Sequence, residues 1–128
     1  MIAAFLLMVA APSAMEECDD LPQQPMNLCV YRNFERADAE MNAQWKATAD
    51  AMKSRDRDLA GSPDGDPGYF ATLLAAQRAW LAYRDSHCLA VSFEARGGSM
   101  QPMLDSACKL ELTRERTRQL KELVEFGN

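Results

Sequence analysis

Three side chains with different chemistry recur at intervals of four in the stretch AAQRAWLAYRDSHC, residues 75–88. Trp80, Arg84 and Cys88 therefore lie on one face of a helix, because residues four apart are neighbours on a helical surface. A guanidinium beside an indole can bind a ligand, and a free thiol can act as a nucleophile. The same face can instead be a structural contact between helices.

The sequence gives little support for catalysis. It contains no G-x-S-x-G, no phosphate-binding loop and no H-E-x-x-H. Asp38 and Asp85 are candidates for acid–base chemistry, but a neighbouring cation explains each of them as an ion pair. His87 is the single histidine, and a surface or capping role near a helix end is favoured over catalysis. We therefore expect that the protein is not an enzyme.

The first fourteen residues, MIAAFLLMVAAPSA, carry no charged side chain. This apolar run is too short to span a bilayer, which requires about 20 apolar residues. An apolar run that ends in small residues is typical of a secretory signal. We expect a signal peptide over residues 1–14, a single mature domain over 15–128 and no stable membrane anchor. The mature chain is then periplasmic or secreted.

An even number of cysteines in a small exported chain indicates disulfides. The four cysteines allow three pairings and are Cys18, Cys29, Cys88 and Cys108. Zinc ligands usually occur in close pairs such as C-x2-C, whereas no two cysteines here lie closer than eleven positions. We expect neither a metal nor another cofactor.

Helical periodicity predicts three helices, and each begins with a proline in its first turn. The prolines are Pro25, Pro67 and Pro102, and Asp66 is the predicted N-cap of the second helix. No segment alternates polar and apolar residues for long enough to form a strand. The predicted fold class is all-α, a three-helix antiparallel bundle with two disulfides. The apolar positions on its helices include Leu28, Tyr31, Phe34, Met41, Trp45, Met52, Phe70, Leu73, Leu74, Trp80, Leu81, Leu89, Phe93, Leu104, Leu112, Leu120 and Leu123.

An antiparallel arrangement sets the register of the cysteines. The second and third helices turn around at RGGSMQP, which places Cys88 and Cys108 within about 3 Å along the helix axis. The first and second helices turn around near residue 61, and in that register Cys29 misses Cys88 by about 8–12 Å, which is too far for a disulfide. This favours Cys88–Cys108 with Cys18–Cys29. The alternative, Cys29–Cys88 with Cys18–Cys108, requires a bend in the first helix.

The same register places Trp80 near Trp45 and Arg84 near Asp38. We therefore predict an indole pair and an Arg–carboxylate ion pair on successive turns of one helix interface. Core packing explains the two indoles, and an interhelical ion pair is the favoured role of Arg84. Ligand binding by Arg84 is the alternative.

Three segments, CVYRNFERADAEMNAQW, QRAWLAYRDSHC and CKLELTRERTRQL, together resemble the LprI-type lysozyme inhibitor family. The resemblance covers residues 18–123 and departs at Trp45, where the family more often has Tyr. It implies a helical, disulfide-linked domain in the bacterial envelope that binds lysozyme or another basic hydrolase. The positions that carry it are Cys29, Asp38, Met41, Asn42, Trp45, Gln77, Trp80, Arg84, Asp85, Cys88, Cys108, Thr113, Arg116 and Leu120.

The chain has 19 acidic and 14 basic side chains, a net charge of −5. This balance argues against a nucleic-acid partner and suits a basic protein surface. One candidate contact is the loop 61–68, where Asp64 and Asp66 can steer a basic partner. The other is the loop 94–103, whose candidate contact residues are Met100 and Met103. Alternatively, both loops are solvated turns, or the protein is an immunity or stress-related binding protein with a partner other than lysozyme.

Overall fold

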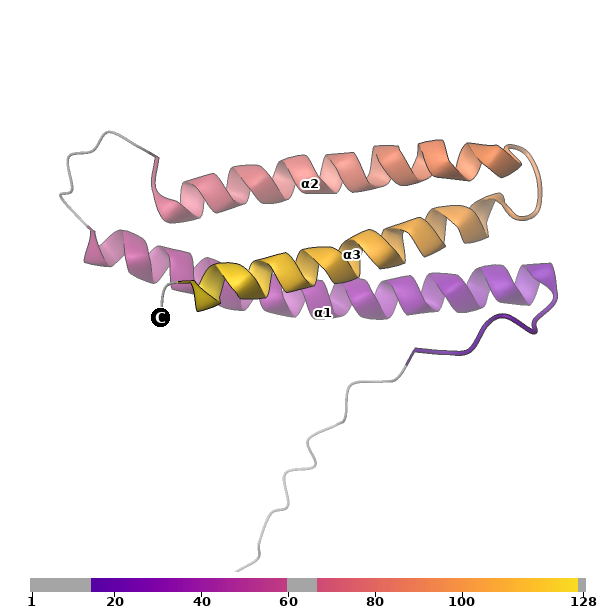
Figure 1. Cartoon of the computed structure of the whole chain (residues 1–128), viewed down its shortest axis with the longest axis horizontal. Helices are drawn as coiled ribbons and strands as arrows, with labels where there is room; N and C mark the ends of the chain where they lie inside the picture. The colour runs from indigo at the N-terminus through magenta and orange to yellow at the C-terminus, as the bar shows by residue number, and fades with distance from the viewer. Residues whose placement is uncertain (1–14, 60–66, 127–128) are drawn as a thin grey trace, which may run out of the picture.

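The computed structural model describes residues 15–59 and 67–126, which form a bundle of three helices (Figure 1). The predicted signal peptide, residues 1–14, lies outside the described residues. The helices are α1 (Gln23–Asp58), α2 (Tyr69–Ser92) and α3 (Gln101–Glu125), with a 3-10 turn, η1 (Phe93–Ala95), directly after α2.

The chain runs along α1, returns along α2 and runs back along α3, so that α2 is antiparallel to both other helices (Figure 1). The described residues contain no strand. The predicted all-α, three-helix antiparallel bundle is thus confirmed. Within the same residues, no helix is both long enough and apolar enough to cross a bilayer.

The predicted helix starts agree with the structure at two of three places. Pro25 lies in the first turn of α1, and Pro102 lies at the start of α3, where a missing N–H breaks no helical hydrogen bond. Helix α2 begins at Tyr69, two residues after Pro67. Its predicted cap, Asp66, lies outside the described residues.

A carboxylate of α1 caps α2 in the structure. Asp56 accepts hydrogen bonds from the backbone N–H groups of Tyr69 (2.7 Å) and Phe70 (3.1 Å). Gly68 makes this approach possible, because a Cβ there would lie 2.9 Å from Asp56 Oδ1. The end of α1 and the start of α2 are therefore held together by one side chain.

A small apolar core lies between the three helices. It consists of Met41, Met52, Leu73 and Leu120, and the partly buried rings packed against it are Trp45, Phe70 and Trp80. Polar side chains occupy much of the remaining interior. They are Asn27, Asn33, Thr48, Gln77, Arg84, Ser92, Ser106 and Thr113.

Several apolar residues of the predicted helix stripes are exposed, namely Leu28, Tyr31, Leu89, Phe93 and Leu123. The interior of α1 near its start is filled by Asn27, Asn33 and Ala37. Because these small or polar residues take the inward positions, Leu28 and Tyr31 point to solvent. The periodic pattern was therefore a correct indicator of helix but a poor indicator of the buried face at this end.

Both predicted disulfides are present. Cys18 is bonded to Cys29, with a Cα–Cα distance of 5.8 Å, and Cys88 is bonded to Cys108, with a Cα–Cα distance of 5.4 Å. Both lie at the end of the bundle where α1 begins, α2 ends and α3 begins (Figure 1). We call this the disulfide end. The opposite end, where α1 ends, α2 begins and α3 ends, is the open end.

Candidate functional site

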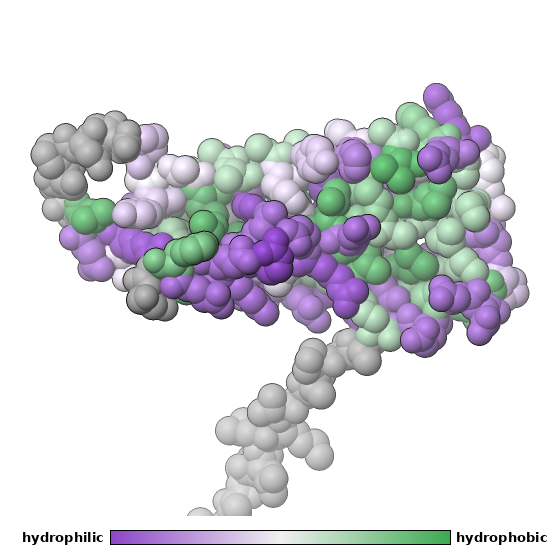
Figure 2. Space-filling model, viewed as in Figure 1, coloured by the Kyte–Doolittle hydropathy of each residue, from purple (hydrophilic) through white to green (hydrophobic). Residues whose placement is uncertain are grey.

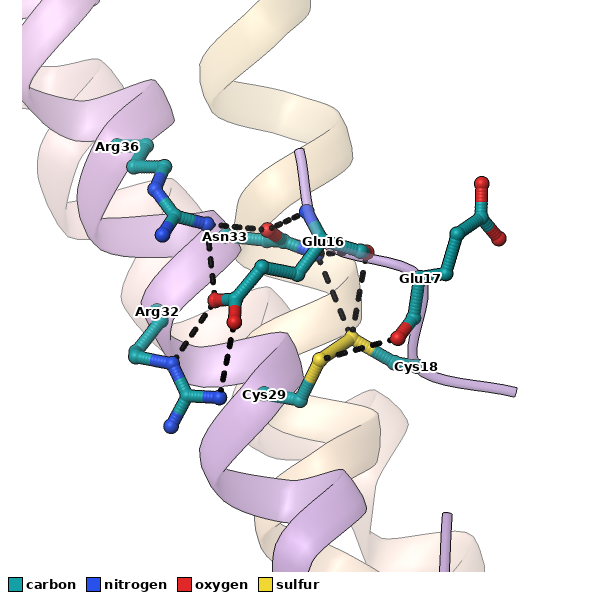
Figure 3. Close-up of polar contacts among 7 residues, drawn as sticks. All are labelled: Glu16, Glu17, Cys18, Cys29, Arg32, Asn33 and Arg36. Atoms are coloured by element: carbon teal, nitrogen blue, oxygen red, sulfur yellow. Dashed lines mark hydrogen bonds and ion pairs between the residues drawn. A yellow bond between two sulfur atoms is a disulfide. The ribbon is translucent and has the colours of Figure 1, made fainter. Parts of the chain in front are cut away.

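The residues before α1 are fixed to that helix by polar contacts beside the first disulfide (Figure 3). The carboxylate of Glu16 pairs with Arg32 at 2.8 Å and with Arg36 at 2.9 Å. The side chain of Asn33 accepts a hydrogen bond from the Glu16 N–H and donates one to the Glu16 carbonyl. Together with Cys18, these contacts hold the N-terminal arm, residues 15–20, against α1.

The hydrogen bond from Arg32 is the main reason why the pKa of Glu16 lies below its ordinary value. The Arg36 guanidinium acts in the same direction, while burial acts against it. Sequence reasoning missed this cluster. Its signal was the spacing of Arg32, Asn33 and Arg36, which places them on one face of α1.

Arg84 connects all three helices from a buried position, with only 7% of its surface exposed. Its Nη1 donates to Asp38 Oδ1 at 3.0 Å and to Thr113 Oγ1 at 3.3 Å, and its Nε donates to Asp85 Oδ1 at 3.0 Å. The predicted contact between Arg84 and Asp38 is therefore formed. A guanidinium that already faces two carboxylates has little capacity for a further anion, so the arrangement fits a structural role.

Trp45 and Trp80, predicted to pack on each other, each pack on a different partner. Trp45 packs on the ring of Phe70, with 6.4 Å between centroids. Trp80 lies under the guanidinium groups of Arg84 (5.2 Å) and Arg116 (5.9 Å). The reason is that α2 packs more closely on α3 than on α1, which brings Trp80 beside a side chain of α3.

Gln77 and Arg116 of the motif also join helices. Gln77 accepts a hydrogen bond from Arg116 Nε at 2.9 Å, and its amide nitrogen lies 3.7 Å from the sulfur of Met41. Asn42 is exposed and contacts Asp38 at 3.5 Å. Gln77 therefore links α2 to both other helices, whereas the contact of Asn42 lies within α1.

The described residues contain neither a free thiol nor a set of metal ligands. All four cysteines are in disulfides, which leaves no thiol as a nucleophile. In the part of the chain that the structure describes, no group of three or more His, Cys, Asp or Glu residues could hold a metal ion.

Apolar side chains are exposed at the disulfide end, where Figure 2 shows apolar residues gathered on the viewed face. We call Leu21, Leu28, Phe93 and Met100 the disulfide-end patch; their exposed fractions are 37%, 61%, 42% and 43%. The exposed acidic residues of the same end are Glu17, Asp19, Asp20 and Glu94. This end thus carries apolar contact area, four acidic side chains and one cation, Arg96, whose guanidinium lies 4.6 Å from the centre of the Phe93 ring.

Hydrogen bonds hold the turn between η1 and α3 in place. Asn27 of α1 donates to the carbonyl of Ser99 at 2.8 Å. Gly97 has a positive φ of 79°, and its N–H donates to the Gln101 side chain at 3.0 Å. Of the two methionines predicted as contact residues, Met100 is exposed, whereas Met103 is partly buried and lies 3.7 Å from Gln23 Nε2. Asp64 and Asp66 of the other predicted loop lie outside the described residues.

The fold and these contacts define a class: a small all-α protein with two disulfides. Residues 15–120 match the family described as Lysozyme inhibitor LprI, and the chain belongs to this family. An uncharacterized protein of Rhizobium meliloti (strain 1021) is 40% identical over 127 residues, which cover 95% of this chain and 91% of that protein. No solved structure matches the chain. Family membership and the two disulfides indicate an extracytoplasmic protein.

Proposed function

We propose that this protein is exported through a signal peptide at residues 1–14 and inhibits a lysozyme-type cell-wall hydrolase by binding to it. The observation that carries the proposal is the family match over residues 15–120. The net charge of −5 supports it, because lysozymes are often strongly basic. The mature protein acts in the periplasm or outside the cell.

The disulfide-end patch is the surface that we assign to the hydrolase. An inhibitor must block a cleft whose chemistry depends on two carboxylates. Leu28, Phe93 and Met100 can bury apolar area at the mouth of such a cleft. Both disulfides lie at this end, so the surface is already ordered before binding and loses little conformational entropy on docking.

Acidic side chains around the patch should steer the encounter with a basic partner. Opposite charges raise the association rate, and salt screens this effect. We therefore expect inhibition to weaken as ionic strength rises. Asp19→Lys with Asp20→Lys should slow association several-fold, whereas the matched control Glu40→Lys with Asp50→Lys, on exposed positions of α1 farther from the patch, should change it less.

The loop 61–68 is the second candidate contact. Asp64→Lys with Asp66→Lys should slow association if this loop also faces the hydrolase. If this pair of substitutions slows association more than Asp19→Lys with Asp20→Lys does, the open end of the bundle, and not the disulfide end, contacts the hydrolase.

A panel of lysozymes tests the proposed function. The purified, oxidised chain is titrated against each enzyme while the hydrolysis of cell walls is followed. At least one enzyme should lose activity in proportion to the complex formed. A panel that stays fully active at micromolar excess of the chain would contradict lysozyme inhibition, and capture of a different envelope protein would then define the function.

A further inference from the structure

A pocket of about 690 Å³ lies at the open end of the bundle, away from both disulfides. All three helices contribute to its wall, through Met52 of α1, Leu73 of α2 and Leu123 of α3. Pockets of about 300–1,000 Å³ with mostly apolar walls are typical of small-molecule sites. We call this cavity the open-end pocket.

The charged side chain in the wall of the open-end pocket is Arg116. Its Nε donates to Gln77 and its Nη1 donates to Gln119, at 2.9 and 3.1 Å. Its Nη2 is buried and has no hydrogen-bond partner among the described residues. Burial also lowers the pKa of this guanidinium.

The surroundings of Arg116 differ from those of the arginines that form ion pairs. Arg84 has Asp38 and Asp85, and Arg32 has Glu16. Within the described chain, by contrast, no carboxylate pairs with Arg116, and its two hydrogen-bond partners are neutral amides. A partly buried cation without a counter-charge is costly, and an anion that enters the pocket would remove this cost.

We propose that the open-end pocket binds a small anionic amphiphile, a carboxylate with an aliphatic tail. The carboxylate pairs with the Arg116 guanidinium, and the tail packs on Met52, Leu73 and Leu123. A carboxylate suits the site better than a phosphate ester does, because the wall offers one guanidinium and the hydroxyl of Thr72 rather than a cluster of cations.

Calorimetric titration with octanoate, octanol and octyl phosphate tests the proposal on the oxidised chain. Octanoate should bind about tenfold more tightly than octanol, because only octanoate forms a charge-assisted hydrogen bond with Arg116. Arg116→Gln should remove this preference, and Arg116→Lys should keep most of it. No binding of octanoate by the parent chain would overturn the proposal, and tighter binding of octyl phosphate would overturn the carboxylate assignment.

A second variant keeps the test valid if substitutions of Arg116 prevent folding. Ala76 lines the pocket and is exposed, so Ala76→Leu should fill part of the cavity without touching the charged group. It should weaken octanoate and octanol alike. The matched control is Ala82→Leu, at an exposed position of α2 outside the pocket wall. Equal binding by both variants would place the ligand elsewhere, which overturns the proposal. Lysozyme inhibition is assigned to the opposite end and is measured separately.

Discussion

Arg84 shows how far individual contacts can be inferred from sequence. Antiparallel register was enough to place it near Asp38, because rise per residue and loop position fix which turns face each other. Its contact with Thr113 could not be inferred in the same way, since it depends on how α2 rotates toward α3. That rotation also explains why Trp80 meets Arg116 rather than Trp45.

The first prediction concerns the contribution of Arg84 to stability. Arg84→Ala should lower the free energy of unfolding by about 2 kcal/mol, because Thr113 loses its partner inside the bundle and two carboxylates lose their cation. Chemical denaturation of Arg84→Ala, Asp38→Ala and the double variant measures the coupling between the two residues. Additive effects would show that the ion pair contributes nothing of its own.

The second prediction concerns Glu16 and acid. The folded pKa of Glu16 is lowered from its ordinary value of 4.5, so its ion pairs stabilise the arm fully above that value. The contribution is lost as the pH falls through the lowered folded pKa. Acidification should therefore lower the protection factor for hydrogen exchange at the Glu16 N–H, which is bonded to Asn33. In Glu16→Gln this exchange should show no such transition; an unchanged transition would assign it to another group.

At the scale of the helices, the sequence allowed good predictions where a local signal sets a boundary. Pro102 and the glycines before it marked the start of α3 correctly. The start of α2 was harder to predict, because its cap, Asp56, comes from another helix and no local sequence pattern reveals it. The prediction of the buried face near the start of α1 was wrong for a related reason. Asn27 and Asn33 lie buried there because they form hydrogen bonds with distant parts of the chain.

The third prediction is that the two disulfides contribute differently to stability. Cys88→Ser with Cys108→Ser removes a link between α2 and α3 that spans 20 positions, and it should lower the free energy of unfolding by about 2–4 kcal/mol. Cys18→Ser with Cys29→Ser should mainly loosen the arm, whose link spans 11 positions. Thermal unfolding and hydrogen exchange distinguish the two effects. An equal loss of global stability in both pairs would contradict this division.

At the scale of the whole molecule, the bundle has two different ends. The disulfide end carries both cross-links and the disulfide-end patch, whereas the open end carries the pocket beside Arg116. The sequence predicted the bundle and its disulfides because helical periodicity and register determine them. It pointed to one residue of the patch, Met100, but could not predict the rest of the patch or the pocket, since both depend on which apolar residues the packing leaves exposed.

Inhibition titrations with two matched double variants test the central claim most directly. Leu28→Ser with Phe93→Ser alters the disulfide end, and Leu59→Ser with Tyr69→Ser alters the open end at side chains exposed by 49% and 44%. The disulfide-end variant should lose inhibition of the sensitive lysozyme about tenfold or more, because buried apolar contacts dominate such interfaces. The open-end variant should inhibit as the parent does. Loss of inhibition in the open-end variant alone would contradict the assignment.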